Sequence, residues 1–97
     1  MITIKEIKKD LKEIRRYYGN TAIFEGNAEI IEKVQKYNSM VCKANVRLFE
    51  LYIIMYAGNN TMEKAAEIMK FSINYVCKRN VMLVQFFYEQ LNKSEVA

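Results

Sequence analysis

Composition places the chain among small helical domains and argues against catalysis. It has 97 residues, no proline, three glycines and no histidine, and 15 basic against 11 acidic residues give a net charge of +4. Without proline, and with apolar residues repeating at helical spacing, the sequence predicts a single all-α domain over residues 1–97. The absence of histidine, of a glycine-rich phosphate loop and of a nucleophile–base pair indicates no enzyme, no cofactor and no metal site.

The cysteines and the longest apolar run bear on the compartment in which the chain works. Cys42 and Cys77 stand alone on apolar helix faces, which is typical of buried free thiols. The apolar run over residues 51–57 is far too short to cross a bilayer, and the N-terminus is charged from Lys5 onward, unlike a signal peptide. We therefore expect a cytoplasmic protein with no membrane partner.

The first predicted helix covers residues 4–18. Thr3 and Glu6 fit a capping box at its start, and Gly19 fits a C′ residue at its end. Its apolar residues form a narrow seam that would pack on another long helix: Ile4, Ile7, Leu11, Ile14 and Tyr18. A basic stripe lies opposite, and is either a solvated face or a surface for phosphates: Lys5, Lys9, Lys12 and Arg16.

Two further helices are predicted in the middle of the chain, after a loop. Asn27 can cap a helix over residues 28–43, which completes an N-terminal helical pair in residues 1–44; its buried stripe contains Ile30, Val34, Tyr37, Val41 and Ala44. Asn45 can cap a helix over residues 46–57, which Gly58 ends. This helix is apolar on nearly all sides, so we expect it to be buried centrally.

The next part of the chain is typical of a short helix, a tight turn and a long helix. Thr61 is a good N-cap for a helix over residues 62–69, and Ser72 can cap a helix over residues 73–91. Two helices joined by so short a turn cross steeply, which predicts a helix-turn-helix. We expect the small Ala66 at the crossing, where a bulkier side chain would not fit.

The long helix carries more apolar surface than one core-facing stripe requires. Its core face is predicted to contain Val76, Asn80, Leu83, Phe87 and Leu91. Further apolar residues must also be covered, namely Val81, Met82, Val84, Phe86 and Tyr88. The first helix offers a seam of matching length, so we expect the two to pack together, with a homodimer favoured over a monomer. Residues 93–97 are expected to fray.

Several residues of this segment resemble the helix-turn-helix of region 4 of sigma-70-type factors: Ala66, Met69, Phe71, Ser72, Val76 and Arg79. The preceding RLFELYIIMY, residues 47–56, resembles the helix that comes before it in that family. With its basic N-terminus, the chain is similar to the small sigma-like transcriptional regulators of phages and prophages, the ArpU type. The sigma-like part covers residues 45–92 and departs from the motif at Lys70, where glycine is usual. A lysine there must adopt a positive φ, or the turn must re-form.

This resemblance implies that the long helix binds double-stranded DNA in the regulation of transcription. Side chains in its first two turns would reach base edges, asparagine pairing with adenine and lysine or arginine with guanine; they are Asn74, Tyr75, Lys78 and Arg79. Residues at the helix starts and in the turn would support binding, chiefly at phosphates; they are Asn60, Thr61, Lys70 and Ser72.

The distribution of charge leaves a second function open. Residues 1–20 carry a net charge of +3, whereas residues 61–97 carry only +1, so the DNA-binding half is itself nearly neutral. A protein-interaction module on the same scaffold would fit this weak charge and the excess apolar surface. Such a module would bind RNA polymerase or inhibit a host protein.

Overall fold

The chain folds entirely into helices. The computed structural model describes residues 2–96, with the backbone alone for residues 94–96. No strand occurs in that range, and the Cα radius of gyration of 13.4 Å is that of a compact domain of this length. The all-α prediction is therefore confirmed. In chain order the elements are α1 (Ile4–Gly19), the 3₁₀ turn η1 (Thr21–Phe24), α2 (Ala28–Val41), α3 (Val46–Tyr52), the π-helical turn η2 (Ile53–Ala57), α4 (Met62–Met69) and α5 (Ile73–Val96).

Each α-helix begins at a polar residue whose side chain accepts a hydrogen bond from a backbone N–H of the first turn. All five predicted N-caps are confirmed. The acceptors and donors are Thr3 with Glu6 (3.2 Å), Asn27 with Ile30 (3.2 Å), Asn45 with Leu48 (3.0 Å), Thr61 with Lys64 (3.1 Å) and Ser72 with Tyr75 (3.2 Å). Each bond satisfies a donor that the helix itself cannot pair, and so fixes where the helix starts.

Two helices end elsewhere than predicted. Helix α2 ends at Val41 instead of near residue 43, because the N–H groups of Lys43 and Ala44 bond three residues back and tighten the chain out of α geometry. Helix α5 continues to Val96 instead of ending near residue 91. The expected fraying of residues 93–97 stays a prediction, and residue 97 lies outside the described residues.

Gly19 does not have the predicted C′ role. It is the last residue of α1 and lacks a positive φ, and the following Asn20 donates its N–H to the carbonyls of Arg16 and Tyr17. The missing side chain matters for packing instead, since a Cβ at Gly19 would lie 2.6 Å from Nδ2 of Asn59. Asn59 itself has φ 52° and accepts a hydrogen bond from Arg15 Nε at 3.1 Å. Gly19 therefore allows α1 to approach the loop before α4.

The predicted helix over residues 46–57 is helical throughout but changes geometry at Ile53. Gly58 donates its N–H to the Ile53 carbonyl at 2.8 Å, a π-type bond, and ends the element as predicted. The expectation of burial on all sides is wrong. Val46, Phe49 and Ile53 are 69%, 37% and 44% exposed, because the other helices cover only one side of this element.

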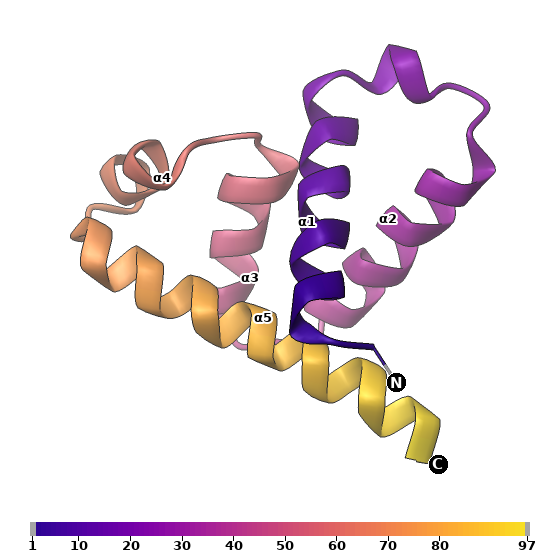
Figure 1. Cartoon of the computed structure of the whole chain (residues 1–97). Coiled ribbons are helices and arrows are strands. Elements are labelled where there is room, and N and C mark those ends of the chain that lie inside the picture. The colour runs from indigo at the N-terminus through magenta and orange to yellow at the C-terminus, as the bar shows by residue number, and fades with distance from the viewer. Residues whose placement is uncertain (1, 97) are drawn as a thin grey trace.

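Helix α5 forms the base of the molecule (Figure 1). Helices α1, α2 and α3 stand on one side of it, and α4 lies at its N-terminal end. Helix α1 contacts α5 as expected, but it crosses α5 instead of running along it. Its first turns, with Ile4 and Lys8, meet residues 80–85 of α5. Val84 is therefore buried, whereas Val81 and Met82 remain 69% and 45% exposed, so the predicted cover is incomplete.

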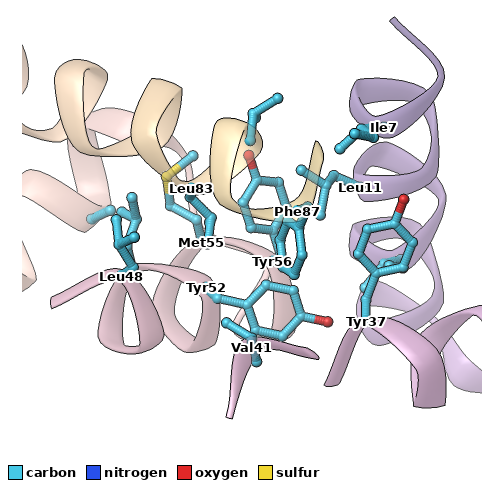
Figure 2. Packing of buried hydrophobic residues seen from close by; sticks show 14 of the residues in the cluster. Ile7, Leu11, Tyr37, Val41, Leu48, Tyr52, Met55, Tyr56, Leu83 and Phe87 are labelled. Carbon is cyan, nitrogen blue, oxygen red and sulfur yellow. The ribbon is translucent and has the colours of Figure 1, made fainter. Parts of the chain in front are cut away.

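The core is built around Phe87 of α5 (Figure 2). Its ring makes edge-on contacts with Tyr37 of α2 at 4.9 Å and Tyr52 of α3 at 5.9 Å between centroids. The predicted seams are buried at their centres: Ile7, Leu11 and Ile14 of α1, Ile30, Val34, Tyr37 and Val41 of α2, and Val76, Leu83, Phe87 and Leu91 of α5. No helix in the described part of the chain is long and apolar enough to cross a membrane.

Three buried tyrosines satisfy their hydroxyl groups inside the fold. Tyr37 donates to Asp10 at 2.7 Å, Tyr52 to Asn38 at 2.6 Å, and Tyr56 to Asn80 at 2.6 Å. Burial raises the pKa of all three phenols, and the hydrogen bond to the Asp10 carboxylate raises the pKa of Tyr37 further. These bonds give the core a polar layer that connects the helices.

The cysteines are placed differently from the prediction. Both Cys42 and Cys77 are exposed free thiols. Cys42 follows the last residue of α2, where the chain turns toward solvent, and Cys77 lies beside Met62 of α4, with 2.9 Å between the sulfur atoms. Apolar neighbours in the sequence therefore did not imply burial at these two positions.

Candidate nucleic-acid interface

The connection between α4 and α5 is a three-residue turn with a left-handed residue. Lys70 adopts φ 61° and ψ 39°, and its N–H bonds to the carbonyls of Ala66 and Glu67. Phe71 donates its N–H to the same Ala66 carbonyl at 3.0 Å. The lysine thus adopts a positive φ, one of the two outcomes expected for it, and its side chain is exposed at the turn. Ala65 and Ala66 are 0% and 6% exposed, so both lie against the rest of the fold.

The first two turns of α5 present polar side chains to solvent. Asn74 and Lys78, one helical turn apart, are both exposed on the face opposite the core residue Val76. Ser72 is also exposed, and its hydroxyl oxygen caps the helix. Within the described residues, Lys70 and Lys78 form no ion pair, so their charges are not neutralised by the chain itself.

Two of the predicted residues belong to a stacked arrangement that we call the aromatic ladder, formed by Arg47, Phe71, Tyr75 and Arg79. The rings of Phe71 and Tyr75 stack with centroids 4.1 Å apart and planes inclined by 29°. The Arg79 guanidinium lies 4.9 Å from the Tyr75 ring centroid, and the Arg47 guanidinium lies 5.4 Å from that of Phe71. Cation–π attraction of this kind orients both arginines at the start of α5.

Sequence reasoning missed Arg47, which reaches the ladder from α3. The spacing of Phe71, Tyr75 and Arg79 at four-residue intervals is a local signal that places these three on one line. Arg47 lies far earlier in the chain, and the ion pair that it forms locally is with Glu50 at 3.5 Å. Its place in the ladder depends on how α3 packs against α5, which no sequence motif indicates.

The residues predicted at the start of α4 differ in what they can offer to a phosphate. Asn60 donates its side-chain amide to the Ile54 carbonyl at 2.8 Å, and so closes the π-helical turn. One of the two N–H groups of this amide is thus engaged within the chain, so the side chain of Asn60 keeps at most one N–H for the predicted phosphate contact. Thr61 is exposed and accepts the N–H of Lys64. The unpaired backbone N–H groups of the first turn of α4 lie beside it.

The predicted basic stripe is exposed along the outer face of α1. Lys5, Lys9, Lys12 and Arg16 are all exposed, and within the described residues they form no ion pair. Two of the acidic residues of α1 point to α2 instead, where Lys33 Nζ lies 3.1 Å from Asp10 and 2.6 Å from Glu13. The hydrogen bond to Glu13 is the main reason that the pKa of Lys33 is raised.

The stripe and the start of α5 are two separate basic surfaces. Helix α1 contacts α5 beside residues 80–85, beyond the turns that carry Asn74 and Lys78. The structure therefore brings together the predicted residues 70–79, whereas the stripe belongs to a different helix, which meets α5 just beyond them.

Comparisons with protein-family models, with curated proteins and with solved structures found no match to this chain.

Proposed function

We propose that the protein binds double-stranded DNA with the start of α5 and acts in the regulation of transcription. In this proposal α4, the turn at Lys70 and α5 act as a helix-turn-helix, with α5 as the recognition helix. The observation that carries the proposal is the capped start of α5, which exposes Asn74 and Lys78 and holds Arg79 against Tyr75. These are residue types that pair with adenine and guanine edges.

Phosphate contacts would come from the turn and from the N-terminus of α4. Lys70 has a left-handed backbone and no ionic partner in the described residues. Thr61 lies beside the unpaired backbone N–H groups of the first turn of α4. Arg47, held against Phe71, adds a cation that the sequence did not indicate. The α1 stripe would be a second, sequence-independent phosphate surface.

The resemblance to sigma region 4 supports the same proposal. The residues that carry it coincide with parts of the turn and the ladder: Ala66 is buried, Phe71 stacks on Tyr75, Ser72 caps α5 and Val76 lies in the core. A role as a small phage or prophage regulator of the ArpU type follows from this resemblance.

A second candidate is a protein-interaction module that binds RNA polymerase or inhibits a host protein. Val81 and Met82 favour it, because both are exposed apolar residues on the outer face of α5.

Fluorescence anisotropy with random-sequence duplex DNA separates the two candidates. We expect binding at about 50 mM salt that weakens steeply by about 200 mM, because neutralised phosphates release counterions. Binding that is absent at low salt, or that does not change with salt, would contradict the DNA proposal and favour the protein-interaction module.

A further inference from the structure

The outer face of α5 is uncovered over residues 73–93, the part of the helix whose side chains are described. In Figure 1 the other helices all lie on one side of α5, and no element lies against the opposite side. Residues on this face are exposed although two of them are apolar: Lys78, Val81, Met82, Gln85 and Glu89. Between α5 and α3 the face continues into a shallow groove that includes Leu48 and the half-buried Phe86.

The order of residues on this face is self-complementary. Lys78, Met82, Gln85 and Glu89 follow at four-, three- and four-residue intervals, the spacing of a seam between two packed helices. The cation lies toward the N-terminus, the carboxylate toward the C-terminus, and the apolar Val81 and Met82 lie between them. A parallel copy of the helix would place like charge beside like charge, whereas an antiparallel copy would place each cation against a carboxylate.

We propose that a second copy of the chain docks on this face, with the two α5 helices antiparallel about a two-fold axis between Leu83 and Val84. In this register Lys78 meets Glu89 of the second copy, and the two-fold axis repeats the pair at the other end. Met82 then meets Gln85 of the second copy near the axis.

The charges on the face favour a second copy as the occupant. Lys78 forms no ion pair in the described residues, and Glu89 only accepts a 3.4 Å hydrogen bond from Gln85. The charges of Lys78 and Glu89 are therefore available to a partner whose own charged groups have the same separation. A single helix face is smaller than the roughly 1,600 Å² of a standard stable interface, so we expect dissociation constants in the micromolar range.

The antiparallel pairing of the two α5 helices would also block DNA binding, an inference that rests on the proposed function. Pairing covers Lys78 and brings Lys93 of the second copy opposite Asn74, so the dimer hides residues assigned to DNA bases. DNA and the second copy would then compete for the start of α5.

Sedimentation velocity without DNA tests the dimer directly. We expect wild-type protein to pass from monomer to dimer as its concentration rises through the micromolar range. Lys78→Glu and Glu89→Lys should each weaken the dimer about tenfold or more, because each places like charges together. The double variant Lys78→Glu with Glu89→Lys should regain the wild-type dissociation constant, because both pairs re-form with reversed polarity.

Matched controls locate the interface. Met82→Glu should weaken the dimer, whereas Ile23→Glu, at a position that is 68% exposed in η1, should not. A wild-type protein that stays monomeric throughout, or a double variant no tighter than the single ones, would overturn the proposal.

A final sedimentation experiment, with DNA added, distinguishes failure of the dimer proposal from failure of the DNA proposal. Adding duplex DNA at low salt should dissociate the dimer. A dimer that persists while DNA binds elsewhere would contradict the proposed competition between DNA and the second copy for the start of α5. A dimer that forms in a protein with no affinity for DNA would leave self-association supported and contradict the DNA function alone.

Discussion

Lys70 is the residue at which side-chain type and backbone geometry conflict most clearly. Its φ of 61° and ψ of 39° lie in the left-handed region, where a Cβ costs about 1 kcal/mol or more relative to glycine. We therefore expect Lys70→Gly to raise the free energy of unfolding by about 0.5–1 kcal/mol, measured by urea denaturation. Lys70→Ala removes the same charge but keeps the Cβ, and should give no such gain. Equal stability of the two variants would show that the left-handed backbone at Lys70 is not strained by a Cβ.

Ala66 is a buried position at which we expect a larger side chain to clash. It is 6% exposed, and its carbonyl accepts N–H groups from both Lys70 and Phe71, so the backbone around it cannot move without loss. Ala66→Leu should destabilise the fold by about 1–3 kcal/mol through overpacking, seen as a lower thermal midpoint. The control is Ala28→Leu, at an exposed position in the first turn of α2, which should change stability little. A melt unchanged by Ala66→Leu would show that the site is not packed.

The three buried tyrosines determine how stability depends on alkaline pH. Their pKa values are raised in the folded state by burial, whereas in the unfolded chain they return to about 10. Stability is therefore fully present below about pH 10 and is lost as the pH rises further, by up to about 1.4 kcal/mol per pH unit for each phenol. Lys33, whose pKa is also raised, acts in the same direction.

Urea denaturation at a series of pH values measures this loss. The free energy of unfolding should be nearly flat from about pH 7 to 9, as expected of a chain without histidine, and should fall steeply above 10. Tyr37→Phe should make the alkaline fall shallower. A fall that is equally steep in this variant would show that Tyr37 ionises as freely in the folded state as in the unfolded one.

At the scale of elements, α5 and α1 should contribute to DNA binding in different ways. Asn74→Ala or Lys78→Ala in α5 should reduce discrimination between DNA sequences, at about 1–3 kcal/mol for each lost base contact. Lys9→Ala combined with Arg16→Ala in α1 should weaken binding to all sequences alike and flatten the salt dependence. Anisotropy titrations with several duplexes at two salt concentrations measure both effects.

The α1 stripe has a clear alternative, because exposed cations on a helix are often only solvated. If the Lys9→Ala and Arg16→Ala changes leave affinity and salt slope untouched, the stripe has no part in binding. The matched control is Lys36→Ala on the exposed face of α2, which we expect to have no effect.

At the scale of the whole molecule, the fold was predictable where signals are local. Caps such as Asn27 and Thr61 bond to residues three positions away, and the seams repeat every turn, so both can be identified from sequence alone. Two of the errors depend on long-range contacts. Gly19 is fixed by its contact with Asn59, and Val81 stays exposed because α1 crosses α5 instead of following it.

The same difference between local and long-range signals applies to the candidate site. Ser72, Asn74 and Lys78 could be assigned from the turn and the helix that follows it. The engagement of Asn60 with Ile54 and the approach of Arg47 to Phe71 depend on how separate elements pack, and no local pattern encodes them.

The measurement that tests the central claim most directly is NMR chemical-shift mapping of the backbone amides during titration with duplex DNA at low salt. The proposal predicts that the largest shifts fall on residues 70–79 around the turn and the start of α5, with smaller ones along the stripe of α1. An absence of shifts, or shifts confined to residues 81–93 of α5, would contradict DNA binding through the start of this helix.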